Sequence, residues 1–261
     1  MKNFCWIALI SVLILSCAGH DEHTLTFDTA SADKMVKLSN DEGSPTCAVH
    51  LKVAYATEES GQKAKAVNAA IQKALLDMKD LTMKQAVDSF ASMYINNYVK
   101  SLLPLYNQDR ADTAKWKWYQ YHYVITTETY NTGKDRLAYI ATIDYSEGGE
   151  HGMNLRRVIN FNTSTGHEIK LTDIFVQGSE RYLTDILQLA LMEKTGAQSI
   201  EQLRRRGFLG DIEIKPKNFL LNGSTITFIF NPEEIAVYEV GATELTIPLS
   251  KLRKLLKQEY Q

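Results

Sequence analysis

The sequence predicts an α+β protein in which antiparallel sheets pack against helices to form one compact, two-lobed unit. Stretches with helical periodicity and stretches with strand alternation follow one another along the chain. An Asn-Gly pair at 222–223 lies between two apolar runs, which is a strong hairpin signal. The composition, 44% hydrophobic and 23% charged, is that of a chain that buries a core rather than that of a disordered protein.

The first residues predict export from the cytoplasm. Lys2 is followed by an apolar run from Phe4 to Leu15, which suits a signal peptide better than a membrane span of about 20 residues. Ser16 and Cys17 end the run and resemble a bacterial lipobox. We therefore expect a signal peptide over residues 1–16 and a lipid on Cys17 that anchors the chain in the bacterial envelope, at the outer membrane, on its periplasmic or its surface face. A plain secretory signal without lipid is the alternative.

Cys47 is the one thiol that such processing leaves free, because Cys5 is removed and Cys17 carries lipid. No intramolecular disulfide is then expected. His50 lies three residues after Cys47, but positions three apart in a strand point to opposite faces. We expect a buried structural thiol.

The first half of the chain predicts a strand followed by two helices. Residues 17–45 are polar and end in a loop signal, so we expect a tether there, with a strand at most at its end. Residues 47–57 alternate as a strand. Apolar periodicity then predicts helices over 62–79 and 82–103, the second ending at Pro104. Their apolar stripes predict core surfaces that pack against a sheet.

The second half is predicted to be rich in strands. Aromatic and β-branched residues from Trp116 to Tyr130 predict a long strand, and residues 137–145 alternate throughout. The remaining expected elements are strands near 153–161 and 167–171, a helix over 179–194 that stops at Gly196, a short capped helix from Ser199 to Gly207, the hairpin at 222–223, a strand over 243–247 and a closing helix from Ser250.

The loop after Asp144 carries the clearest functional signal. Residues 148–152 read Gly-Gly-Glu-His-Gly, and glycines allow positive φ and a close approach to another surface. Two carboxylates about 5–10 Å apart can cleave a glycan. Asp144, Glu150 and His151 are therefore the candidate catalytic residues. The simpler interpretation is that His151 holds the turn by hydrogen bonding.

Composition and spacing exclude several other classes. The net charge of −2 argues against nucleic-acid binding. No two of the six histidines are four residues apart, and His151 with Glu150 lacks a third ligand at a diagnostic spacing, so we expect neither a metal nor another cofactor.

Four short motifs occur in order along the second half: residues 148–152, residues 160–162 with Thr165-Gly166, Leu-Thr-Asp-Ile-Phe at 171–175, and Asn-Pro-Glu-Glu-Ile-Ala at 231–236 with Gly241. They resemble the extracytoplasmic, lysozyme-binding domain of RsiV-like anti-sigma factors. The preceding part resembles the accessory domain of PdaC-type peptidoglycan deacetylases. The resemblance implies an accessory domain over 46–140 and an RsiV-like domain over 141–261. That family usually has Ala and Tyr where this chain has Glu150 and Glu233.

The resemblance implies a non-catalytic binding module of the cell envelope, whose partner is a cell-wall enzyme such as lysozyme or a peptidoglycan fragment. Acids in the two signature loops would attract a cationic lysozyme surface. The implied partner-binding residues are Glu147, Gly148, Gly149, Glu150, His151, Glu233, Glu234 and Glu239. One alternative is an envelope glycan hydrolase that uses carboxylates of the Asp144–His151 loop. Another is a structural protein that binds a second lipoprotein.

Overall fold

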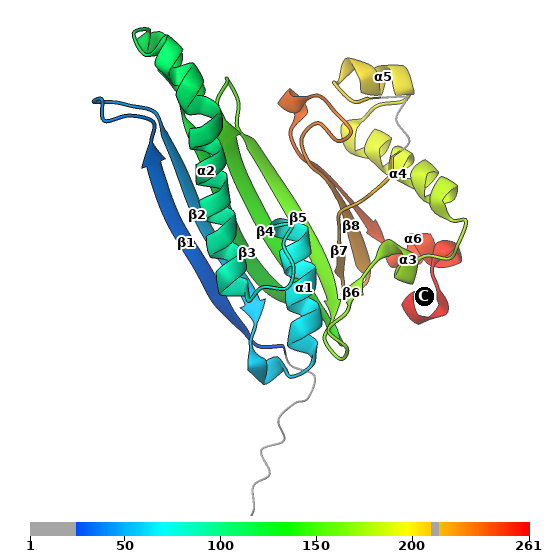
Figure 1. Ribbon diagram of the computed structural model, residues 1–261. Helices are drawn as coiled ribbons and strands as arrows, with labels where there is room; N and C mark the ends of the chain where they lie inside the picture. The colour runs from blue at the N-terminus through cyan, green and yellow to red at the C-terminus, as the bar shows by residue number, and fades with distance from the viewer. Residues whose placement is uncertain (1–24, 210–213) are drawn as a thin grey trace, which may run out of the picture.

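The computed structural model of the protein describes residues 25–209 and 214–261, which form two lobes side by side (Figure 1). The predicted signal peptide, Cys17 and the first part of the predicted tether lie outside these residues. Within the described ranges, no helix combines the length and the apolar character needed to cross a membrane.

A six-stranded sheet forms the first lobe, in the order β1-β2-β3-β4-β5-β6. Only the β2–β3 pair is parallel among these neighbours, because two helices connect the two strands and return the chain to the same end of the sheet. The strands are β1 (Phe27–Lys37), β2 (Thr46–Ala56), β3 (Tyr121–Gly133), β4 (Arg136–Glu147), β5 (Met153–Asn162) and β6 (Glu168–Ile169).

Helices α1 (Lys63–Leu75) and α2 (Met83–Asp109) cover one face of this sheet (Figure 1). The core between them contains the alternate residues of β2 and the apolar stripes of both helices, which are fully buried. Cys47 belongs to this core, and burial raises the pKa of its thiol to about 11. The expectation of a buried structural thiol is confirmed, and His50 lies on the opposite face of β2.

The second lobe packs a three-stranded antiparallel sheet against short helices. Its strands are β7 (Phe219–Asn222), β8 (Thr225–Phe230) and β9 (Thr243–Pro248), and its helices are α3 (Leu171–Ile174), α4 (Glu180–Thr195), α5 (Ile200–Arg205) and α6 (Leu249–Leu252). Short 3₁₀ helices complete both lobes: η1 (Glu58–Ser60), η2 (Thr113–Tyr119), η3 (Tyr238–Val240), η4 (Arg253–Leu255) and η5 (Gln258–Tyr260).

Two asparagine side chains join the lobes along the edge of β5 that β6 leaves unpaired. The N–H of Val158 donates to Oδ1 of Asn218 at 2.8 Å, and the N–H of Arg156 donates to Oδ1 of Asn231 at 2.8 Å. Both asparagines return a hydrogen bond from Nδ2 to the carbonyl of Arg156, at 2.8 and 3.1 Å. Buried backbone groups are costly without partners, so these amides take the place of a neighbouring strand.

A third asparagine makes the same kind of contact in the other direction. Asn160, on β5, donates from Nδ2 to the carbonyl of Phe219 at 2.8 Å and accepts from the N–H of Leu221 at 2.9 Å. Asn160 and Asn218 are each only 3% exposed. The side-chain amides of Asn160, Asn218 and the half-buried Asn231 are called the asparagine seam below.

The predicted α+β class is confirmed. The predicted left-handed stop at Gly196 is also present, with φ +66°. The hairpin β7–β8 forms where predicted, but Asn222 pairs with Thr225, so Gly223 and Ser224 make the turn.

The predicted end of the second helix at Pro104 is wrong, because α2 continues to Asp109. Proline removes one helix hydrogen bond, but the last turns are held from outside the helix. Tyr106 is fully buried, and its ring packs 5.8 Å from the rings of Trp116 and Tyr119.

The predicted strand from Trp116 is also wrong at its beginning, because residues 113–119 form η2 and β3 starts at Tyr121. Asp112 accepts the N–H of Ala114 at 3.2 Å, and Trp116 donates from Nε1 to the carbonyl of Arg110 at 3.3 Å. These contacts bend the aromatic segment around the end of α2.

The predicted limit between residues 45 and 46 coincides with the start of β2, but the predicted domains divide the large sheet. Residues 27–37 of the predicted tether form β1 and pair along their full length with β2. The limit between residues 140 and 141 falls inside β4. The large sheet therefore contains residues from both sides of that limit.

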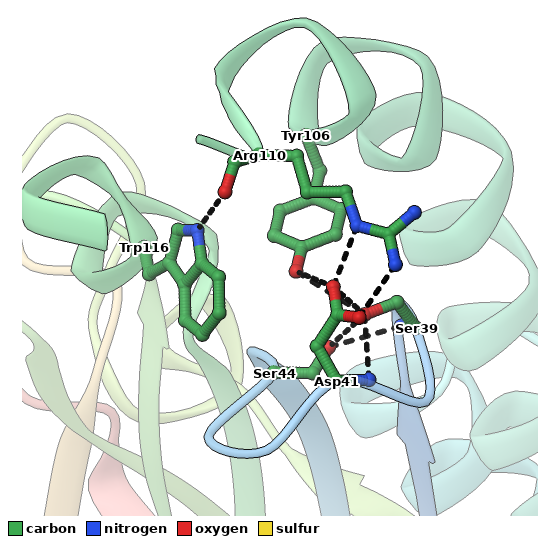
Figure 2. Close-up of polar contacts among 6 residues, drawn as sticks. All are labelled: Ser39, Asp41, Ser44, Tyr106, Arg110 and Trp116. Atoms are coloured by element: carbon green, nitrogen blue, oxygen red, sulfur yellow. Dashed lines mark hydrogen bonds and ion pairs between the residues drawn. The ribbon is translucent and has the colours of Figure 1, made fainter. Parts of the chain in front are cut away.

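Figure 2 shows a polar cluster that fixes the β1–β2 turn to the end of α2. Arg110 donates from Nε and Nη2 to the two carboxylate oxygens of Asp41 at 2.6 and 2.5 Å. Ser39 and Tyr106 donate hydroxyl hydrogen bonds to the same carboxylate at 3.0 and 3.3 Å. The hydrogen bonds from Arg110 lower the pKa of Asp41 to about 2.

The Asp41 cluster predicts a dependence of stability on pH. Because the folded-state pKa of Asp41 lies below its ordinary value of 3.8, its contribution is present above pH 4 and is lost as the pH falls toward 2. We expect Asp41→Asn to unfold at lower urea concentration than wild type at pH 6, with a difference that shrinks between pH 4 and pH 2. Glu42→Gln, an exposed neighbour, is the control. A difference that stays constant over this range would contradict the assignment.

Candidate functional site

The two predicted signature loops contact each other. The β4–β5 loop (148–152) and the β8–β9 connection (231–242) lie toward the same end of the molecule (Figure 1). The ring of His151 stacks on that of Tyr238, with 4.9 Å between centroids and 27° between planes. The hydroxyl of Tyr238 donates to the carbonyl of Gly152 at 2.7 Å. Segments 86 residues apart in sequence thus form one surface.

Glycine determines the path of the β4–β5 loop. Gly148 and Gly149 have φ values of +76° and +86°, as the sequence predicts for such a loop. A Cβ atom on Gly148 would lie 2.1 Å from the carbonyl oxygen of Trp118, at the end of η2. The loop is therefore pressed against η2 at a place where only glycine fits.

Asp144 and Glu147, which precede the loop, lie on opposite faces of β4. Oδ1 of Asp144 is 2.7 Å from Nε2 of His122, and its Oδ2 accepts from Asn154 at 3.3 Å, on the face away from the helices. Oε1 of Glu147 accepts from the hydroxyl of Tyr94 on α2 at 2.9 Å. These two carboxylates consequently do not face a common substrate.

A row of side chains crosses the sheet face that α1 and α2 leave uncovered. Asp33, His50, Val124, Asp144 and Asn154 are register neighbours on β1 to β5. Nδ1 of His50 lies 3.1 Å from Oδ1 of Asp33, so the row begins with one His–Asp pair. Further along the row, Asp144 pairs with His122, which lies on β3 two residues before the row position Val124. The sequence did not predict this row. To predict it, one would need to know how strands that are distant in sequence are aligned with one another in the sheet.

The acids of the β8–β9 connection have different roles. Oε2 of Glu234 accepts from the N–H of Asn231 at 2.9 Å, and its own N–H donates to the carbonyl of Asn231 at 3.1 Å. Glu234 therefore closes the turn that begins at Asn231. Glu233 is exposed and has a φ of +68°, which is uncommon for a residue other than glycine.

All five predicted partner-binding acids are exposed, and Glu147 and Glu234 are the two whose carboxylates accept the hydrogen bonds described above. The carboxylates of Glu150, Glu233 and Glu239 have no hydrogen-bond or ion-pair partner among the described residues. Residues 25–209 and 214–261 contain no group of three or more His, Cys, Asp or Glu side chains that could hold a metal ion. Cavities of about 680 and 840 Å³ lie elsewhere, beside α4 and beside the α1–α2 connection. The site is thus an exposed acidic surface rather than a cleft.

Comparisons with known proteins agree with this fold. Residues 172–250 match the family described as a protein of unknown function, DUF3298. A DUF3298 member from Bacteroides fragilis has a similar structure, with a TM-score of 0.81 and 26% identity over 90% of this chain and 94% of that one. A DUF3298 family protein from Pseudomonas aeruginosa has a TM-score of 0.63 and 16% identity over 91% of this chain and 96% of that one. No curated protein matches the sequence.

The two loop glycines provide a matched test of the geometry. Both have positive φ, but only Gly148 is in contact with backbone atoms of η2. We expect Gly149→Ala to lower the free energy of unfolding by about 1 kcal/mol and Gly148→Ala by about 3 kcal/mol or more, because the second change adds a clash to the backbone strain. Urea titrations of both variants measure this difference. Equal losses would show that the loop does not press against Trp118.

Proposed function

We propose that this chain is a non-catalytic, lipid-anchored binding module of the bacterial cell envelope, and that its partner is a cationic cell-wall enzyme such as lysozyme. The observation that carries the proposal is the contact between the two signature loops through His151, Gly152 and Tyr238. This contact assembles exposed acids from distant parts of the chain on one surface.

The surface is preorganised. Gly148 fixes one loop against η2, and the turn closed by Asn231 and Glu234 fixes the other. A surface that is already ordered loses less conformational entropy on binding than a mobile one. Glu150, Glu233 and Glu239 would then attract a basic partner and increase its rate of association.

The proposed anchor agrees with the position of this surface. A lipid on Cys17 would hold the chain at the outer membrane, and the described chain enters the fold at β1. Strand β1 begins at the end of the large sheet opposite to the signature loops (Figure 1). A tether joined there would present the loops away from the membrane.

The positions of the carboxylates favour binding over glycan hydrolysis. Both oxygens of Asp144 have partners, and Glu147 lies on the other face of β4. The ring of His151 is stacked on Tyr238 and supports the loop contact. A hydrolase would need two carboxylates that flank one substrate.

A binding titration tests the proposal. We expect soluble residues 18–261 to bind lysozyme with a roughly micromolar or lower Kd at low salt, and less tightly at moderate salt, because ions screen exposed charges. The double variant Glu150→Gln, Glu239→Gln should bind about tenfold more weakly, because it removes two attractive charges. The double variant Glu58→Gln, Glu59→Gln on η1 makes the same change in net charge at the opposite end and is the control.

No binding at either salt concentration, or equal losses in both double variants, would rule out lysozyme at this surface. Binding of soluble peptidoglycan fragments instead would identify a glycan ligand. Release of new reducing ends from peptidoglycan by the same protein would contradict the non-catalytic assignment.

A further inference from the structure

Arg136, the first residue of β4, has a buried nitrogen without a hydrogen-bond partner. Its Nη1 is shielded from solvent and donates to no acceptor in the described residues. The ion pairs found in this part of the chain do not include Arg136. A buried donor on a charged group is costly when it is unpaired. Within residues 25–209 and 214–261, Arg136 therefore has neither an acceptor for Nη1 nor a carboxylate counter-ion.

The same arginine lines a cavity of about 470 Å³ between the two lobes. The N–H of Gly223 donates to the carbonyl of Thr132 at 2.8 Å, and that of Leu249 donates to the carbonyl of Ser224 at 2.8 Å, so the walls are tied together. The lining residues are Arg136, Gly223, Ser224, Leu249, Ser250, Arg253, Glu259, Tyr260 and Gln261. The C-terminal segment, which supplies three of these lining residues, lies beside α6 (Figure 1).

The lining has the chemistry of an oxyanion site. Arg136 and Arg253 supply two guanidinium groups, and Ser224 and Ser250 supply hydroxyl groups. Glu259 is the one carboxylate side chain of the lining, and no ion pair joins it to either arginine. Guanidinium groups bind phosphate and carboxylate oxygens through short, charge-assisted hydrogen bonds.

We propose that this cavity binds a phosphate group, free or as the monoester of a small molecule. The phosphate oxygens accept hydrogen bonds from the guanidinium groups of Arg136 and Arg253, so that the bound anion supplies the counter-ion that both arginines lack among the described residues. Cavities of about 300–1,000 Å³ hold small organic ligands, so the space beyond the phosphate favours an ester. Because the walls come from both lobes, the bound ligand stabilises their contact. The site does not include the signature loops, so it is independent of the proposed partner.

The test uses the full chain in a neutral detergent, titrated with glucose 6-phosphate, inorganic phosphate and glucose. We expect the two phosphates to bind and to raise the melting temperature, and glucose to do neither. Arg253→Gln should weaken binding about tenfold or more, because it removes a charged hydrogen-bond donor at an exposed position. Lys254→Gln, an exposed neighbour that does not line the cavity, should change binding less than about twofold.

Tighter binding of glucose 6-phosphate than of inorganic phosphate identifies a monoester site, and equal binding identifies a site for the free ion. Arg136→Gln is a second variant, and its melting temperature without ligand shows whether it folds. The proposal is overturned if neither phosphate binds, or if Arg253→Gln binds as tightly as wild type.

Discussion

The asparagine seam is the interaction on which the rest of the structure depends. The edge of β5 that β6 leaves unpaired would expose backbone groups ready to pair with another chain. Side-chain amides of Asn218 and Asn231 satisfy these groups, and Asn160 bonds to β7 in return. Asn231 also begins the turn that Glu234 closes. The same residue therefore joins the lobes and positions one of the two signature loops, while the other loop leads directly into β5.

This arrangement explains why short motifs identify the fold better than the partner. Asn160 and Asn231 belong to the seam, and Asp173 accepts the N–H of Lys170 at 2.8 Å at the start of α3. Gly166 has a φ of +75°, and a Cβ atom there would lie 2.8 Å from the carbonyl of Lys63. Each of these motif residues has a structural task. In the proposed binding module, specificity for a partner would then come from positions without such a task, such as Glu150.

Local sequence patterns predicted much of the fold. The errors arose where contacts between residues distant in sequence determine where an element ends or what it packs against. Periodicity predicted both helices of the first lobe, and the glycines predicted positive φ at 148 and 149. The continuation of α2 beyond Pro104 was not predictable, because its last turns depend on Tyr106 and on Asp41 from another element. Asn218 lies in a stretch without a periodic pattern, so its contact with β5 had no local signal. The His122–Asp144 pair required the register of β3 on β4.

Hydrogen exchange of the native protein, followed on peptides that cover β5 and β8, tests the seam most directly. The comparison is between wild type, Asn218→Ala and the exposed hairpin variant Asn222→Ala. If the seam couples the lobes, Asn218→Ala should accelerate exchange in β5 and β8 by a similar factor, because both strands then open together. Asn222→Ala should change neither strand appreciably. Faster exchange in β5 alone, with β8 as protected as in wild type, would show that the lobes are held together by other contacts.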